Sequence, residues 1–239
     1  MSLAGCSWTL FDSREVGDTG RDSTNVYFYN AAASEEELSV YVADQGSDDE
    51  AYLTDLDYQQ KSDWQIFVGS RDFIFRRPGE SPAVARGNAS LSTESRYAVF
   101  VTSLYNSPDD VRVVGAEPGE LSADGARLRV AYLPADVDDA PTVDVYRSDG
   151  TGEKKLFSDV DPGTITSYET DGIGADEWVG QVRLKESGTG NLVIQTASQE
   201  VTLKGEAAYT FLVSGADDTS TLPADYPPLS IASFLEESR

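Results

Sequence analysis

The chain contains an internal duplication, and this feature constrains its fold more than any other. Three blocks recur in the same order in the two halves of the sequence. The first pair is NVYFYNAAASEEELSVYV from Asn25 and RLRVAYLPADVDDAPTVDVYR from Arg127, each with two strand-like stretches around a turn. The other two pairs of matching blocks are residues 53–64 with 156–168 and 89–103 with 199–215. Ordered recurrence of this kind predicts two copies of one structural unit.

Each copy has the pattern of an antiparallel β-sandwich. Apolar side chains recur at every second position, as in Val26 and Phe28 of the first copy and Phe211 and Val213 of the second. Period two places these side chains on one packed face of a strand, and we expect the other face to contact water. Turn signals such as Asp161-Pro162-Gly163 interrupt the pattern at the spacing typical of sandwiches. We therefore predict an all-β protein with two tandem antiparallel β-sandwiches, immunoglobulin-like or transthyretin-like, each with about seven strands in two sheets.

The expected organisation has five segments. They are a lipobox remnant and flexible tether (1–22), a first sandwich (23–115), an acidic linker with Pro and Gly (116–124), a second sandwich (125–215) and a C-terminal extension (216–239).

The C-terminal extension is predicted to contain a short helix. Pro227 and Pro228 precede a cap at Leu229 or Ser230, and the segment after the cap is SIASFLEESR. A helix there would carry Ile231, Phe234 and Leu235 on one face. Because so short a helix is marginal alone, it would either dock on the second sandwich or recruit a partner protein.

The charge balance excludes several classes of function. The chain has 42 Asp and Glu against 18 Lys and Arg, no His, and a formal net charge of −24. Binding to nucleic acid requires clustered cations, so we expect no nucleic-acid partner. A chain without His lacks the Ser-His-Asp triad and the His-based metal site. The acidic excess fits a protein of salty surroundings, where screening relieves self-repulsion, and it fits ordinary acidic solubility equally well.

The only cysteine, Cys6, lies in the stretch Leu3-Ala4-Gly5-Cys6. This stretch resembles the bacterial lipobox, in which the thiol receives a diacylglyceryl group and the chain is cut just before the cysteine. Only Met1 to Leu3 precede it, without the charged and apolar regions of an export signal, so we expect a shortened, soluble copy of the precursor. The alternative is an incidental cysteine near a frayed terminus.

By the same resemblance, Ser7 after the cysteine points to the outer membrane of the cell envelope. Two or three acyl chains on Cys6 would hold the protein at a membrane, since a single chain binds only marginally. The polar segment 7–22 is predicted to be a flexible tether, which at about 3.4 Å per residue would reach roughly 50 Å.

The second copy resembles a known bacterial family. Arg129-Val130, Pro134-Ala135-Asp136, Ala140-Pro141, Val143-Asp144-Val145-Tyr146 and Asp149-Gly150 match the strand, turn and strand elements of the domain-of-unknown-function family 4397, and YTFLVSG (209–215) is similar to its closing strand. The first copy is divergent, with AAASEEE in place of the turn. The resemblance implies tandem envelope or secreted domains without established catalytic residues.

Loop carboxylates are the remaining candidates for a chemical site. Asp136, Asp138 and Asp139 are the first residues to consider as calcium ligands, although no EF-hand spacing is present and acidic loops are usually only solvated. Paired acids such as Asp159 and Asp161 could also be the two carboxyl groups that a glycoside hydrolase uses. Such an enzyme further requires a cleft and one buried, protonated carboxyl group. We expect no resident cofactor.

Six aromatic residues could form a sugar-binding platform or could equally be packing residues. They are Tyr27, Tyr29, Tyr52, Tyr58, Tyr105 and Trp178.

These observations favour a non-enzymatic, lipid-anchored envelope protein that serves adhesion, assembly or partner binding. Its expected partners are a membrane, through Cys6, and an envelope protein or glycan. A carbohydrate-binding module, with or without calcium, is the second hypothesis. A hydrolase that uses loop carboxylates is the third.

Overall fold

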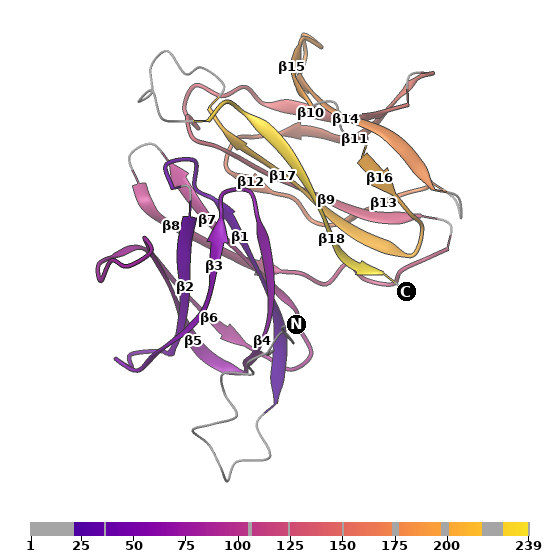
Figure 1. The fold of residues 1–239 in the computed structure, drawn as a ribbon. Helices are drawn as coiled ribbons and strands as arrows, with labels where there is room; N and C mark the ends of the chain where they lie inside the picture. Colours follow the sequence, from indigo (N-terminus) through magenta and orange to yellow (C-terminus); the bar gives the residue numbers. More distant parts are fainter. Residues whose placement is uncertain are drawn as a thin grey trace, which may run out of the picture.

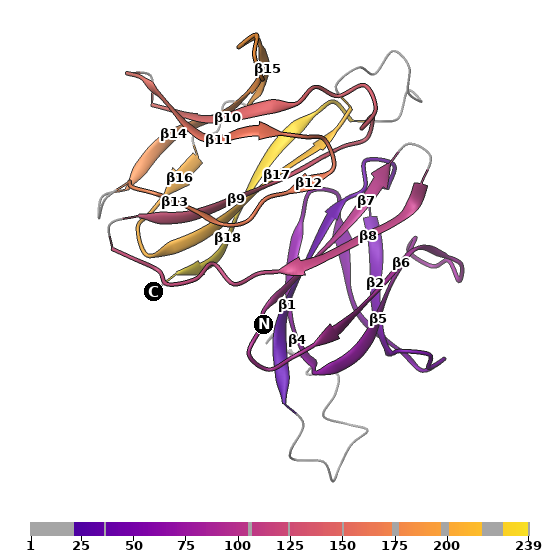
Figure 2. The same cartoon turned by 180° about the vertical axis from the view of Figure 1, so that it is seen from behind.

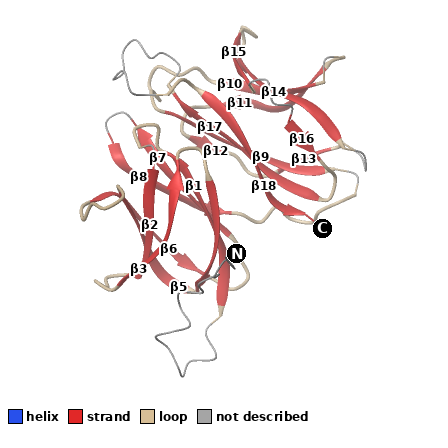
Figure 3. Ribbon diagram, in the orientation of Figure 1, coloured by secondary structure: helices blue, strands red, loops and turns tan. Residues whose placement is uncertain are grey.

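The computed structural model describes residues 22–35, 37–104, 107–123, 125–149, 151–173, 177–196, 201–216 and 227–238. Figure 3 shows these residues folded into strands and loops, without a helix. The protein is therefore all-β, with four sheets that form two sandwich domains, and the predicted fold class is confirmed. The same residues contain no helix long and apolar enough to cross a membrane.

Domain 1 comprises the first eight strands. They are β1 (Ser23–Ala31), β2 (Glu37–Asp44), β3 (Glu50–Asp57), β4 (Lys61–Phe67), β5 (Gly69–Arg76), β6 (Ala83–Leu91), β7 (Tyr97–Leu104) and β8 (Ser107–Gly115). One sheet has the order β4-β1-β7-β8 and the other has the order β3-β2-β5-β6.

Domain 2 comprises the remaining strands. They are β9 (Ala126–Pro134), β10 (Val143–Ser148), β11 (Glu153–Val160), β12 (Thr164–Ile165), β13 (Glu169–Asp171), β14 (Trp178–Glu186), β15 (Leu192–Gln195), β16 (Val201–Leu203), β17 (Ala207–Gly215) and β18 (Ser230–Ser238). One sheet has the order β12-β9-β17-β18, with β13 also on β9, and the other has the order β11-β10-β14-β15, with β16 also on β14.

The two domains share one topology, as the duplication predicts. In each domain the first strand pairs with the penultimate strand, which pairs with the last, while the second strand lies in the opposite sheet (Figures 1 and 2). The expectation of purely antiparallel sheets is wrong in one respect, because β1 runs parallel to β7 and β9 runs parallel to β17. The strand count of the described residues also exceeds the expected number of about seven, with eight strands in domain 1 and ten in domain 2.

The predicted C-terminal helix is wrong. Residues 230–238 form β18, which pairs antiparallel with β17 from Ser230↔Ser214 to Ser238↔Ala207. The apolar spacing of Ile231, Phe234 and Leu235 fits one face of a helix, but the free edge of β17 offers a row of unpaired backbone groups. A strand satisfies those groups, whereas a marginal helix would leave them open.

Each domain has its own core between its two sheets. The predicted inward residues are fully buried there, including Val26 and Phe28 in domain 1 and Phe211 and Val213 in domain 2. The predicted water-facing sides of these strands are buried as well, because the sheet β4-β1-β7-β8 packs against the sheet β12-β9-β17-β18. The prediction of a wet second face is therefore wrong for these two sheets.

Candidate functional site

The predicted lipidation site, Cys6, lies outside the described residues. Asp136, Asp138 and Asp139 lie on the loop between β9 and β10. Asp136 is buried, and its backbone carbonyl accepts hydrogen bonds from the N–H groups of Asp139 and Ala140 at 3.0 and 2.9 Å. Within the described ranges no group of three or more His, Cys, Asp or Glu side chains is arranged to hold a metal ion. The structure therefore does not gather these aspartates into a metal site.

The candidate aromatic residues do not form a common platform. Tyr27, Tyr29 and Trp178 are buried, and Tyr105 lies outside the described residues. Tyr58 is hydrogen bonded to Ser214 across the domain junction. Tyr52 is 39% exposed and meets Tyr41 edge-on, with 5.5 Å between ring centroids. Partial burial and a hydrogen bond from its hydroxyl to Asp55 raise the pKa of Tyr52 to about 12.

The junction between the domains is a third apolar cluster. It consists of Tyr27, Tyr29, Ala31, Ala98, Phe100, Ala116, Ala131, Leu133 and Leu212. Tyr29 and Phe100 stack with centroids 4.5 Å apart, and Phe234 of β18 meets the Tyr29 ring at 5.4 Å. Small residues such as Ala98 and Ala131 allow the two sheets to approach closely.

A buried ion pair lies inside this cluster. Arg129 on β9 and Glu236 on β18 are joined by a contact of 2.6 Å, and their side chains are 1% and 2% exposed. Arg129 Nε donates to Thr210 Oγ1 at 2.7 Å, and Thr210 Oγ1 donates to Glu236 Oε1 at 2.6 Å. The Tyr29 hydroxyl of domain 1 donates to the same carboxylate oxygen. The network therefore links residues of both domains.

Two further observations explain how a buried arginine is tolerated. Its guanidinium lies 5.4 Å from the Phe100 ring centroid and 4.8 Å from that of Tyr168, so aromatic faces replace part of its hydration. It also donates to the Gly115 carbonyl of domain 1 at 3.2 Å.

Burial, followed by the charge of Glu236, raises the pKa of Tyr29 well above its usual value. Tyr29 therefore stays a hydrogen-bond donor at any physiological pH.

Strand β18 ties the two domains together along its length. Gln59 donates to the hydroxyl of Ser230 at 2.7 Å, and Lys61 donates to the backbone carbonyl of Leu235 at 2.9 Å. Tyr27 donates to the carbonyl of Glu236 at 3.3 Å. These contacts join side chains of domain 1 to the last strand of domain 2.

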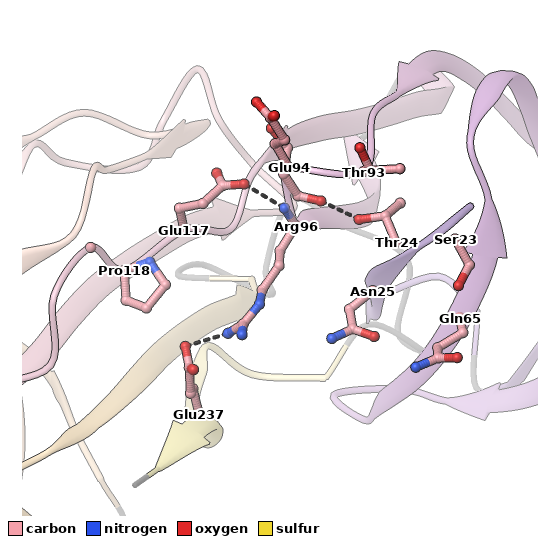
Figure 4. A pocket seen from close by; sticks show the side chains of 12 residues that line it. Ser23, Thr24, Asn25, Gln65, Thr93, Glu94, Arg96, Glu117, Pro118 and Glu237 are labelled. Atoms are coloured by element: carbon pink, nitrogen blue, oxygen red, sulfur yellow. Dashed lines mark hydrogen bonds and ion pairs between the residues drawn. The ribbon is translucent and has the colours of Figure 1, made fainter.

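A polar hollow of about 540 Å³ lies where the two domains meet near the start of β1. Its lining comes from β1, β4, the β6–β7 loop, the segment after β8 and the end of β18. Segments far apart in the sequence therefore surround one cavity (Figure 4). The lining residues are Ser23, Thr24, Asn25, Gln65, Thr93, Glu94, Ser95, Arg96, Glu117, Pro118, Gly119 and Glu237. We call this cavity the junction hollow.

Arg96 is the central side chain of the junction hollow. Its guanidinium pairs with Glu237, and its backbone N–H donates to the Glu117 carboxylate (Figure 4). The hydrogen bond to Glu237 raises the pKa of Arg96, so its positive charge is fixed. Thr24 donates to the backbone carbonyl of Ser95 and holds the β6–β7 loop against β1. The hollow is therefore braced by contacts within and between the domains.

Sequence reasoning did not identify the buried ion pair or the junction hollow. One signal for the former was present, because β1 and β9 carry apolar residues on both faces, which is typical of strands buried on both sides. The hollow gave no such signal, since Asn25, Gln65, Arg96 and Glu237 come from four separate segments.

Among the described residues, three carboxyl groups have a displaced pKa, in each case downward. The pKa of Asp144 is lowered chiefly by a hydrogen bond from Lys155, and that of Glu153 by hydrogen bonds from Lys185 and Arg183. The pKa of Asp149 is lowered by the hydroxyl and backbone of Thr151. All three stay ionised at neutral pH, whereas the general acid of a glycoside hydrolase requires a raised pKa. These acids serve local structure.

No protein-family model matches the chain, and no curated protein matches it. The resemblance to family 4397 remains a prediction. Among solved structures, a DUF3823 family protein from Parabacteroides merdae has a TM-score of 0.27 and 14% identity, and the match covers 77% of this chain and 100% of that one. The fimbrial anchor protein Mfa2 from Porphyromonas gingivalis has a TM-score of 0.21 and 12% identity, with 91% and 100% covered. A protein proposed to act in cell adhesion, from Bacteroides eggerthii, has a TM-score of 0.25 and 8% identity, with 93% and 98% covered. At these identities and TM-scores the likeness does not assign a function to this chain.

Proposed function

We propose that the protein is a rigid, non-enzymatic scaffold of the bacterial cell envelope. In this proposal it is anchored at the outer membrane by lipid on Cys6, and its two sandwiches hold a partner protein or glycan at a fixed orientation. The proposal rests chiefly on one observation, the buried junction with the Arg129–Glu236 pair at its centre.

The junction supports a scaffold because it removes freedom between the domains. Domains within one chain move relative to each other by default unless their interface is large and apolar. Here Tyr29, Phe100, Ala131 and Leu212 are all fully buried between the two sheets. Separating the domains would also break the hydrogen bonds from Tyr29 of domain 1 to Glu236 and from Arg129 to the Gly115 carbonyl of domain 1. A body of this kind transmits position and force without a hinge.

Rigidity is tested by a distance measurement between the domains. Spin labels on Asn88→Cys of β6 and Asn191→Cys beside β15, in a Cys6→Ser background, would report the distance by electron–electron dipolar spectroscopy. We expect one narrow distance distribution that is unchanged in viscous solvent. A broad or two-peaked distribution would contradict a rigid scaffold, and a label pair within domain 1 controls for motion of the label itself.

The anchor is tested separately in cells. The precursor with its own export signal is expressed as wild type, as Cys6→Ser and as the control Thr9→Ala, which keeps the thiol. We expect labelled palmitate and membrane fractionation in the wild type and the control, and loss of both in Cys6→Ser, because the thioether requires the thiol. Equal labelling of Cys6→Ser and wild type would exclude the anchor.

A further inference from the structure

We propose that the junction hollow is a binding site for a neutral saccharide. Its volume of about 540 Å³ falls in the range of roughly 300–1,000 Å³ that is usual for small-molecule sites. Every lining residue except Pro118 and Gly119 has a polar side chain. Such a lining matches a ligand with many hydroxyl groups and little continuous apolar surface. The inference does not depend on the lipid anchor or on the scaffold role.

Asn25 and Gln65 supply the principal hydrogen-bonding groups. They are directly opposite each other in the β1–β4 register, so their two carboxamides lie side by side on one wall, with Arg96 facing them (Figure 4). Within the described part of the chain, neither carboxamide has a hydrogen-bond partner. Each carboxamide both donates and accepts, and neighbouring sugar hydroxyls do the same. The pair therefore matches adjacent hydroxyls on a ring.

The charges in the hollow disfavour an anionic ligand and do not require a cationic one. Glu94, Glu117 and Glu237 line the hollow, and Arg96 is the only cationic side chain among its lining residues, so a carboxylate or phosphate would meet like charge. Glu237 is engaged with the Arg96 guanidinium, and Glu117 with the Arg96 backbone N–H. Most of the acidic charge is thus already used within the protein. The groups left over are mainly uncharged, which favours a neutral saccharide over a basic peptide.

The junction also keeps this site in shape. Glu237 belongs to β18, and Pro118 belongs to the segment after β8, whereas Asn25 and Gln65 belong to domain 1. Arg96 is held from both sides, because the Ala116 N–H also donates to the Arg96 carbonyl at 2.7 Å. The hollow is therefore preformed, and a ligand would bind without ordering a loop.

The test is calorimetric titration of the full chain with defined probes. The probes are glucose, galactose, N-acetylglucosamine, maltose, lactose and chitobiose as neutral saccharides, glucuronate as an anion and trilysine as a cation. We expect at least one neutral saccharide to bind at millimolar concentration. The variant with Asn25→Ala and Gln65→Ala should lose about tenfold or more in affinity, because each lost hydrogen bond weakens binding several-fold.

The matched control removes the same groups elsewhere. Asn88→Ala with Gln45→Ala alters one exposed Asn and one exposed Gln away from the hollow, and it should bind like the wild type. Unchanged thermal unfolding of both double variants shows that a loss of binding is local. Binding of trilysine alone would overturn the proposal in favour of a basic peptide. Absence of saccharide binding, or equal loss in both double variants, would overturn it as well.

Discussion

At the scale of single residues, the Arg129–Glu236 pair decides how the junction behaves. Both side chains are almost fully desolvated, and Glu236 Oε1 receives hydrogen bonds from Tyr29, Thr210 and Arg129. A buried pair of this kind adds little net stability compared with apolar residues of similar volume, since desolvation offsets the attraction. Removing only one residue of the pair is costly, because the charge of the other residue then stays buried without a partner. The pair therefore specifies the docked arrangement of the two domains more than it strengthens the fold.

Arg129→Ala is expected to lower the free energy of unfolding by about 3–5 kcal/mol. The double variant Arg129→Met with Glu236→Leu should lose much less than Arg129→Ala alone, because no charge is left buried. Arg183→Ala is the control, since Arg183 pairs with Glu153 at 2.9 Å at the surface and should cost less than about 1 kcal/mol. Urea unfolding measures all three, and equal costs for Arg129→Ala and Arg183→Ala would contradict this account.

At the scale of elements, β18 is the segment that sequence reasoning assigned incorrectly. As a strand it directs Phe234 toward Tyr29, while Leu235, the next residue, is 49% exposed. As a helix it would have placed both side chains on the same face. The difference arises from pairing with β17, a contact that no local pattern of apolar residues encodes.

Substitution along β18 therefore distinguishes a strand from a helix. Phe234→Ala should cost about 2–4 kcal/mol, because it removes an aromatic ring from the junction cluster. Leu235→Ala should cost less than about 1 kcal/mol, because that side chain is largely in water. Chemical unfolding of the two variants measures the contrast. Similar losses for both would indicate that they share one buried face.

The strands of each sandwich were predictable because their apolar period of two is local. Val26 and Phe28, like Phe211 and Val213, lie in the cores where the alternation places them. The role of Tyr29 was not predictable, because its burial depends on a second copy of the same unit packing against it. The junction hollow was beyond sequence reasoning for a similar reason, since its walls meet only after the domains have docked.

At the scale of the whole molecule, the shared junction should make the two domains unfold together. Calorimetry of the wild type is expected to give one transition whose van't Hoff and calorimetric enthalpies agree. Phe100→Asp places a charge in the stacked pair with Tyr29, and it should split the transition into two. Asn88→Asp, on the exposed surface of β6, is the control and should leave a single transition. Two transitions in the wild type would show that the junction does not couple the domains.

The stability of the molecule should be nearly independent of pH between about 5 and 8, because no histidine titrates there. Below that range it should fall. The folded pKa values of Asp144 and Glu153 are lowered, so their contribution is present above the unfolded values of about 4 and is lost as the pH drops through the folded values. Urea midpoints across this range, taken at one fixed and moderate ionic strength, measure the effect. A fall in stability already between pH 8 and 6 would contradict it.

The net charge of −24 implies that the thermal stability of the protein depends on salt concentration. Screening lengths shrink from about 30 Å in 10 mM salt to about 3 Å in 1 M salt, so repulsion among surface carboxylates is strong in the first case and weak in the second. Sodium chloride should therefore raise the midpoint of thermal unfolding over this range, even though it weakens exposed ion pairs. Asp48→Asn with Asp49→Asn, which removes two exposed charges from the β2–β3 turn, should reduce the slope. A midpoint that falls with salt would contradict this prediction. It would show that attraction within surface ion pairs outweighs repulsion among the surface carboxylates. The buried Arg129–Glu236 pair would not explain such a fall, because salt screens it much less.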